Sequence, residues 1–282
     1  SQVRPAAVLL GGGTKLLAFE RLFTAHRRRV YVQRRRPKRG WSWARALPLI
    51  QGDFTQRDAT LVARKNNRVL LYVQVGDLRR RRAAVRLYRS VGDSLRWTDG
   101  GRLKLRLPGT STRLVLTQPF AAPDPAGGVL LTVTRRFARG ADGCHLARGA
   151  DGLRFGPLRR ISAGHRCRVV ATARGHLVLT YQSRARRRLP WRSYFRRSTD
   201  GGKTWSKPRA VSALHATSEV HTLVGSGGAL RFLFVVTLRR GSAIQSAQWT
   251  GTKRVERRLT RPTGHRDIAP FGLLTKGGYR VY

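Results

Sequence analysis

Arginine is the residue type of this chain with the clearest capacity for chemistry, because it is abundant and occurs in runs. Fifty Arg and eight Lys stand against 13 acidic residues, which gives a formal charge of +45. A guanidinium binds phosphate, sulfate or carboxylate through paired hydrogen bonds, so this excess predicts a polyanionic partner, nucleic acid or acidic glycan. The alternative is that these runs are solvated hairpin tips. The runs concerned are Arg27, Arg28, Arg29, Arg34, Arg35, Arg36, Arg79, Arg80, Arg81, Arg82, Arg186, Arg187 and Arg188.

The composition excludes several classes of protein. The 282 residues are 40% hydrophobic, which is enough for a packed core and argues against intrinsic disorder. No stretch has the roughly 20 apolar residues of a membrane span. The chain contains no Met, even at position 1, so we expect a processed amino terminus and a secreted or organellar protein. Cys144 and Cys167 form either one bridge or two free buried thiols, of which we expect the thiols.

Short apolar segments come in pairs separated by Gly- or Asn-containing turns. Examples are residues 6–10 with 16–19, and residues 177–181 after 169–171. Each segment has the length and composition of a strand, and no long helical periodicity interrupts them. Six such pairs, beginning near residues 3, 57, 114, 165, 218 and 266, predict an all-β chain of repeated units in a single domain, residues 1–282.

A turn sequence supports the repeat. In the segment from Ser198 to Trp205, Asp200 can accept hydrogen bonds from its own backbone and Gly202 tolerates a positive φ. The pattern S-x-D-x-G-x-T-W resembles the Asp box of sialidases and related repeat proteins. Weaker versions occur around Asp151, around Trp97 and at residues 36–43. The resemblance implies a six-bladed β-propeller of four-stranded antiparallel blades.

The order of segments also resembles the exo-sialidase family over nearly the whole chain. The resemblance implies that Arg4 and Arg239 bind a sialic acid carboxylate. It places Glu219 where the family has a Glu, and His265 where the family has its nucleophilic Tyr. The acid/base Asp of the family has no counterpart in the loop after Phe19, and Asp58 is a substitute from the same rim.

Two of these assignments have structural alternatives. Asp58 is equally the residue type that caps a turn at the start of a strand. Glu219 is equally an ion-pair partner for neighbouring Arg. The histidines include no close metal-ligand pair with a carboxylate, so we expect no metal and no cofactor.

Three functions remain open on the sequence. The first is a degenerate sialidase-like propeller that binds a polyanion, nucleic acid or acidic glycan, without catalysis. The second is a secreted sialidase-type glycoside hydrolase acting on sialylated glycans. The third is an engineered propeller whose surface acids were replaced by Arg, which the Arg and Lys at positions 36–39 favour.

Overall fold

The computed structural model describes residues 2–23, 28–48, 55–64, 68–77, 82–91, 95–109, 115–136, 142–172, 175–184, 191–213, 217–225, 229–238, 241–250, 253–261, 272–275 and 278–281. These residues are almost entirely strands and turns, with one short 3-10 helix, η1 (Gly11–Gly13). None of the helical structure among them is long and apolar enough to cross a membrane.

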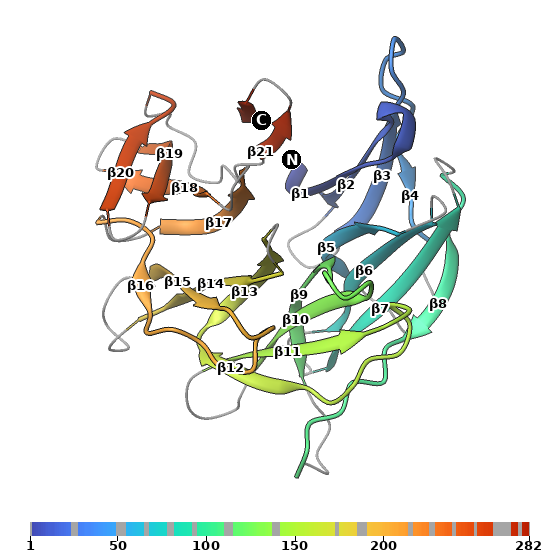
Figure 1. Cartoon of the computed structure of the whole chain (residues 1–282). Helices are drawn as coiled ribbons and strands as arrows, with labels where there is room; N and C mark the ends of the chain where they lie inside the picture. Colours follow the sequence, from blue (N-terminus) through green and yellow to red (C-terminus); the bar gives the residue numbers. More distant parts are fainter. Residues whose placement is uncertain are drawn as a thin grey trace. The chain divides into compact units, whose positions relative to one another are not determined.

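The first compact unit, Ser1–Ala163, contains three four-stranded antiparallel sheets, which we call blades 1 to 3 (Figure 1). Blade 1 consists of β1 (Gln2–Leu9), β2 (Lys15–Leu22), β3 (Arg28–Arg35) and β4 (Arg45–Ala46). Blade 2 consists of β5 (Gln56–Ala63), β6 (Arg68–Asp77), β7 (Arg82–Val91) and β8 (Thr98–Arg102). Blade 3 consists of β9 (Leu116–Pro123), β10 (Val129–Arg135), β11 (Gly143–Gly149) and β12 (Arg159–Ala163).

The second compact unit, Gly164–Tyr282, contains two further four-stranded blades and a hairpin. Blade 4 consists of β13 (His165–Ala171), β14 (Leu177–Ser183), β15 (Arg192–Ser198) and β16 (Arg209–Ala210). Blade 5 consists of β17 (Thr217–Val224), β18 (Leu230–Leu238), β19 (Gly241–Thr250) and β20 (Lys253–Arg258). The hairpin pairs β21 (Gly272–Thr275) with β22 (Gly278–Val281).

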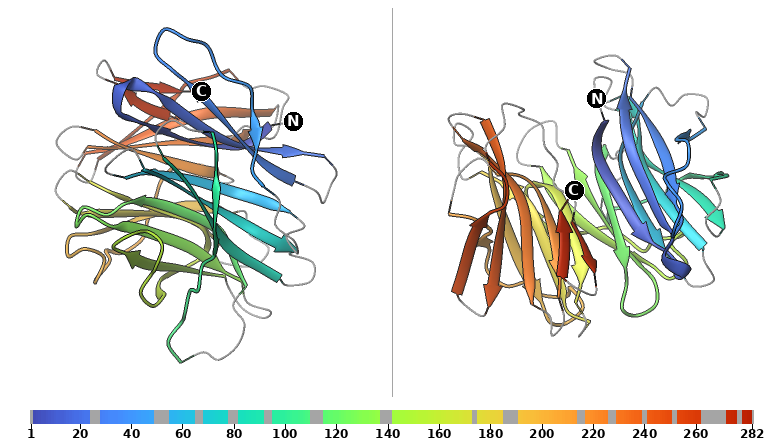
Figure 2. Two further views of the ribbon diagram at one scale, coloured as in Figure 1. Left: turned by 90° about the vertical axis from the view of Figure 1, so that its right-hand side faces the viewer. Right: turned by 90° about the horizontal axis from the view of Figure 1, so that it is seen from above.

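Within each blade every strand pairs with its neighbour in sequence, as the two views of Figure 2 show. The predicted four-stranded antiparallel blades are therefore confirmed. The predicted number of six is wrong, because the described residues form five such blades. Of the sixth apolar pair, segment 268–271 lies outside the described residues, and segment 279–282 falls mostly on β22, which pairs only with β21 in the described part of the chain. The single-domain assignment stays a prediction.

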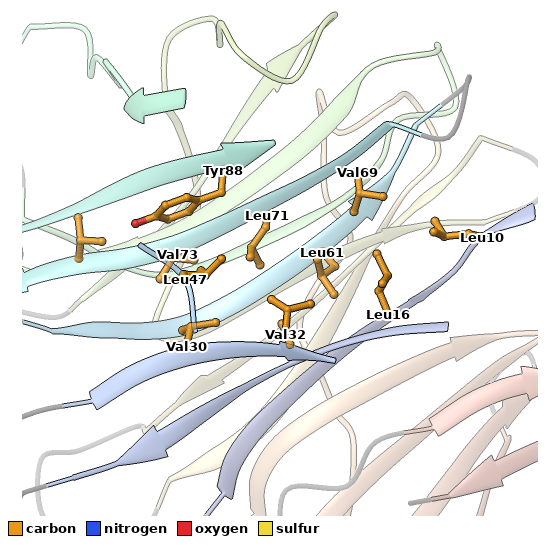
Figure 3. Packing of buried hydrophobic residues seen from close by; sticks show 12 residues of the cluster. Leu10, Leu16, Val30, Val32, Leu47, Leu61, Val69, Leu71, Val73 and Tyr88 are labelled. Carbon is orange, nitrogen blue, oxygen red and sulfur yellow. The ribbon is translucent and has the colours of Figure 1, made fainter. Parts of the chain in front are cut away.

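Apolar side chains fill the space between successive blades of the first unit. β5 lies beside both β1 and β9, so each blade packs a face against the next. Between blades 1 and 2, Val32, Leu61 and Leu71 meet in one cluster (Figure 3). A second cluster joins blade 2 to blade 3 around Tyr72 and Leu131, and both side chains are fully buried. These clusters follow from the nearly continuous apolar runs of strands that are buried on both faces, such as residues 69–73 and 129–133.

Both cysteines are disulfide-bonded, so the expectation of free thiols is wrong. Cys144 lies on β11 and Cys167 on β13, and neither is exposed. Burial was predicted correctly. The oxidation state was not, because the spacing of two cysteines in the sequence does not show whether they are bonded.

The turn from Ser198 to Trp205 is held by the carboxylate of Asp200. Its Oδ1 accepts hydrogen bonds from the Ser198 hydroxyl at 2.8 Å and the Thr204 N–H at 2.9 Å, and its Oδ2 accepts from the Thr204 hydroxyl at 2.6 Å. The Ser198 hydroxyl in turn accepts from the Gly202 N–H. The side-chain hydrogen bond from Thr204 is the main reason that the pKa of Asp200 is far below its ordinary value.

A shortened turn in blade 3 uses the same chemistry. The Asp151 carboxylate accepts from the N–H groups of Leu153 and Arg154 at 2.8 and 2.9 Å. Burial alone would raise the pKa of Asp151, but these two hydrogen bonds lower it. The Gly152 carbonyl accepts a 2.7 Å hydrogen bond from the buried Tyr72 hydroxyl of blade 2. The turn therefore fixes one blade against the next.

We predict that Asp200→Ala lowers the melting temperature, because it removes the carboxylate that accepts the hydrogen bonds of the turn from Ser198 to Trp205. The folded pKa lies below the ordinary 3.8, so the contribution of Asp200 is complete above about pH 4 and is lost as the pH falls further. Thermal melts of both proteins from neutral to acid pH measure this. The difference in melting temperature should be constant near neutrality and shrink in acid. A difference that grows in acid would contradict the assignment.

Candidate functional site

The first strand of every blade has an irregularity near its start. The pairing register shifts between Val3 and Ala6 in β1, between Arg57 and Thr60 in β5, and at the corresponding place in β9, β13 and β17. A bulge breaks the ladder locally and redirects a side chain, and bulges occur frequently beside active sites. The first strand therefore has a bulge at the same position in all five blades.

Three of these bulges place a non-glycine residue in the left-handed region. Asp58 has φ 48°, Gln118 has φ 53° and Arg166 has φ 53°. Only one other described non-glycine residue, Lys38, has a positive φ. A side chain in this conformation costs roughly 1–2 kcal/mol, so the surrounding structure must hold it there. Strain that recurs at one repeat position indicates a position used for function.

A side chain of the preceding blade holds two of the bulges in the first unit, those of β5 and β9. The Asp58 N–H donates to Oε1 of Glu20 on β2 at 2.7 Å. One blade further on, the Gln118 N–H donates to Oε1 of Gln74 on β6 at 2.9 Å. Glu20 and Gln74 therefore play the same part in successive blades, and each fixes the residue that the next blade presents.

Glu20 is completely buried, and both of its oxygens are bonded. Its Oε2 accepts from Nη1 of Arg28 at 3.1 Å, and the Arg28 side chain is 23% exposed. A buried carboxylate needs such a partner, because an unpaired charge in the interior is very unfavourable. This pairing makes Glu20 a positioning residue rather than a proton donor to a ligand.

Gln118 is also held through its side chain. Its Oε1 accepts a hydrogen bond from the Thr134 hydroxyl at 3.1 Å, and Thr134 lies on β10 of the same blade. Both Asp58 and Gln118 are half-buried. A carboxylate residue and a carboxamide residue thus lie at the starts of β5 and β9, on strands rather than loops. Such groups hydrogen-bond to hydroxyl groups of a ligand.

The second unit has a cationic and aromatic group at the matching position of blade 4. Arg166 occupies the bulge, and His165 beside it packs on Trp191 with ring centroids 4.0 Å apart. The Arg184 guanidinium lies 4.5 Å from the centre of the Trp191 ring. On the neighbouring β17, burial and then the charge of Arg168 lower the pKa of His221 to about 3, which keeps the ring neutral.

Several other described carboxylates have structural roles. Asp99 pairs with Arg86 at 2.7 Å, and Asp124 lies 3.6 Å from Arg148. Glu256 on β20 accepts from the Ser212 hydroxyl and the Ala213 N–H. Asp58 differs from these carboxylates in its place, at the strained bulge near the start of β5.

The structure describes some of the predicted site residues and not others. Arg28 and Arg29 were expected to contact a polyanion, and this stays a prediction; within the structure Arg28 bonds Glu20 and Arg29 donates to the Leu47 carbonyl. Arg4 lies on β1 and Glu219 on β17, but only their backbones are described. His265, Arg239, Arg27, residues 79–81 and residues 186–188 lie outside the described residues, and of Arg82 only the backbone is described. The roles assigned to them stay predictions.

The sequence did not lead us to predict that Glu20 and Gln74 hold the bulges of the next blades, or that Gln118 lies at one of them. A signal was present, because a polar residue follows four mostly apolar ones in each of the second strands β2, β6, β10 and β14. These polar residues are Glu20, Gln74, Thr134 and Gln182. No cluster of three His, Cys, Asp or Glu residues that could hold a metal occurs in the described part of the chain.

Comparison with known proteins shows similarity in structure alone. Neither a protein-family model nor a curated protein sequence matches the chain. A protein of unknown function from Dyadobacter fermentans matches with TM-score 0.72 and 13% identity, over 96% of this chain and 86% of that one. The Hadza microbial sialidase Hz136 matches with TM-score 0.64 and 13% identity, over 90% of this chain and 57% of that one.

A third match is an ulvan lyase of polysaccharide lyase family 25, in a structure bound to -[GlcA(1-4)Rha3S]-. It has TM-score 0.63 and 10% identity, over 92% of this chain and 70% of that one. Arabinanases are also among the matches. At these identities the likeness shows the fold: a β-propeller of four-stranded antiparallel blades, shared with several glycan-degrading enzymes. A sialidase is one of these neighbours.

We predict that Glu20→Ala destabilises the protein by about 1–3 kcal/mol, because it leaves the Asp58 N–H and Arg28 without their buried acceptor. Glu20→Gln should retain most of the stability, because Gln74 shows that a carboxamide oxygen can hold the next blade. Urea denaturation of the two variants measures the difference. Equal loss from both would mean that the ion pair with Arg28, and not the hydrogen bond to Asp58, carries the contribution.

Proposed function

We propose that this chain binds an acidic polysaccharide at the start of its first strands, and that it holds this ligand without cleaving it. The observation that carries the proposal is the strained pair Asp58 and Gln118, each locked by a side chain of the preceding blade. A structure that maintains an unfavourable backbone in successive repeats, with polar side chains there, is arranged for recognition.

Charge supports an acidic ligand. The formal charge of +45 gives the protein a strong positive field, which attracts anionic chains and repels cationic ones. Arg28 and Arg57 flank the site on β3 and β5, and both are half-buried. The ulvan lyase neighbour, bound to a uronate- and sulfate-containing glycan, is an example of this fold holding such a ligand.

The arrangement of acids supports binding over hydrolysis. A glycosidase that uses two carboxyl groups needs a proton donor and a nucleophile or base on either side of the scissile bond. In the first unit, Asp58 is one such group. Glu20 is the nearest other acid that the structure describes, and Arg28 and the Asp58 N–H occupy its oxygens.

The closed blade-to-blade contacts also suit a rigid binding site. Thr60 of blade 2 exchanges hydrogen bonds with Ala121 of blade 3, with its hydroxyl accepting from the Ala121 N–H at 3.2 Å. This pair lies two and three residues beyond the two strained positions. The site therefore sits on strands rather than loops, which lowers the entropy lost on binding.

Replacing Asp58 or Gln118 by glycine distinguishes an effect on ligand affinity from an effect on stability. Glycine adopts a positive φ without strain, and this relief offsets part of what is lost with each side chain, such as the hydrogen bond from the Thr134 hydroxyl to Gln118. Asp58→Gly and Gln118→Gly should therefore change the stability by no more than about 1 kcal/mol. The same variants should bind a heparin oligosaccharide several-fold more weakly, since each loses a ligand hydrogen bond worth about 1 kcal/mol. Calorimetric titration and thermal melts measure the two effects on the same samples.

Gly101 provides a matched site for comparison, because it has a positive φ but lies in β8, far from the start of the first strands. Gly101→Asn should leave the affinity unchanged. Loss of stability without loss of affinity in the Asp58 and Gln118 variants would overturn the proposal.

Salt should weaken the binding steeply, because counterions return to the glycan as Arg side chains release it. Affinity for heparin should fall as NaCl rises, while a neutral dextran should not bind at any salt concentration. Incubation with a fluorogenic sialoside tests the alternative. If the protein hydrolyses the sialoside and Asp58→Asn abolishes this activity, the function of the site is hydrolysis and not binding alone.

A further inference from the structure

The turn that ends β3 differs from its counterparts in other blades. In blade 4, Ser206 holds the equivalent turn: its N–H donates to the Arg197 carbonyl and its hydroxyl accepts from the Arg197 N–H. In blade 1, Ser42 makes the same two hydrogen bonds with Arg34. Trp41 and Trp205 therefore occupy the same position, immediately before these serines.

The exposure of these two tryptophans is different. Trp205 is partly buried, with its indole nitrogen covered, and the aromatic residues Trp97 and Phe155 of the other turns are partly buried as well. Trp41 is 46% exposed, and Trp43, two residues further on, is 93% exposed. Water around two such rings is unfavourable, and tryptophans in this state indicate a surface that is covered by a partner.

The neighbouring strands extend this surface. Pairing places Leu9 opposite Lys15, Lys15 opposite Arg35, and Arg35 opposite Trp41, so these side chains form one row on one face of blade 1. Leu9, at the end of that row, is 55% exposed. Apolar side chains thus stand at both ends of the row, with cationic ones between them.

The hairpin carries positive charge and no negative charge. Residues 34–45 contain Arg34, Arg35, Arg36, Lys38, Arg39 and Arg45 and no Asp or Glu. The backbone is nevertheless well fixed. The Gln33 amide donates to the Ser42 carbonyl, the Arg39 N–H donates to the Arg36 carbonyl, and Pro37 lies against Gly13 of η1.

We infer that this basic tryptophan hairpin, residues 34–45 with Leu9 and Lys15, docks on an anionic lipid surface. Tryptophan is enriched at the level of lipid headgroups, where its ring is apolar and its N–H remains hydrogen-bonded. Basic side chains beside it bind the anionic headgroups. A ring as exposed as Trp43 projects outward, and the exposed Leu9 has a natural place in lipid but none on a phosphate backbone.

The hairpin lies at the opposite end of the strands of blade 1 from the binding site proposed above. Arg35 and Trp41 are at the end of β3, whereas Arg28, which holds Glu20, is at its beginning. Lipid docking therefore does not depend on the glycan site, and each activity can be lost separately.

The test uses the full chain and vesicles of phosphatidylcholine with or without phosphatidylglycerol. The chain should sediment with the anionic vesicles only, and brominated lipid should quench its tryptophan emission. Trp41→Ala/Trp43→Ala should abolish the quenching and reduce binding at least tenfold. Lys38→Gln/Arg39→Gln should reduce binding by roughly fivefold per charge, since each basic residue near such a surface contributes about 1 kcal/mol.

Two exposed basic residues of β20 serve as the matched control. Lys253→Gln/Arg257→Gln removes the same charge from another exposed hairpin and should change vesicle binding far less than the variant at Lys38 and Arg39. Equal effects of the two pairs, or no quenching by brominated lipid, would overturn the inference. So would a tryptophan variant that keeps vesicle binding and loses binding to single-stranded DNA or to heparin, because these rings would then stack on a base or a sugar.

Discussion

A hydrogen bond between neighbouring blades fixes the part of this protein that we propose to bind a ligand. In the first unit, Glu20 accepts from the Asp58 N–H, and Gln74 accepts from the Gln118 N–H. Each bond holds a residue in a backbone conformation that it would not adopt alone. The acceptor belongs to one blade and the strained residue to the next. The conformation of the strained residue therefore depends on the packing of the two blades. Loss of either would loosen the other.

This constraint explains how acidic residues are used in a chain that has so few. Asp200 and Asp151 close turns, Glu20 holds a bulge and Glu256 ties β20 to the segment after β16. Positive charge is left in large excess on the surface, where it repels itself and favours anionic partners. The acidic polysaccharide and the lipid surface proposed here both draw on that excess, at opposite ends of the strands of blade 1.

The strands were predictable because their signal is local. Alternating apolar segments separated by Gly-containing turns identified five pairs of strands, and the segment from Ser198 to Trp205 contains all the groups that hold its own turn. The sixth blade was overpredicted from the apolar segments 268–271 and 279–282, of which the structure describes residues 279–281, on β22. An apolar segment predicts a strand, but not how many further strands pair with it.

The site was harder to predict, because its contacts are not local. The hydrogen bond from Asp58 to Glu20 spans 38 residues, and that from Gln118 to Gln74 spans 44. Asp58 was identified, but as a substitute acid rather than as a strained residue, because a bulge depends on the register of two strands. The sequence also does not reveal that Arg28, which was assigned to a polyanion, bonds the buried Glu20. The disulfide-bonded state of Cys144 and Cys167 was missed for the same reason, and it agrees with an oxidising compartment.

Hydrogen–deuterium exchange with and without a heparin oligosaccharide tests the central claim most directly, because it reports which backbone segments the ligand covers or stiffens. Recognition at the strained residues predicts slower exchange in segments 55–60 and 115–120, and no change in the turn at 198–206. Slower exchange confined to the basic outer strand β20, with segments 55–60 and 115–120 unchanged, would contradict it.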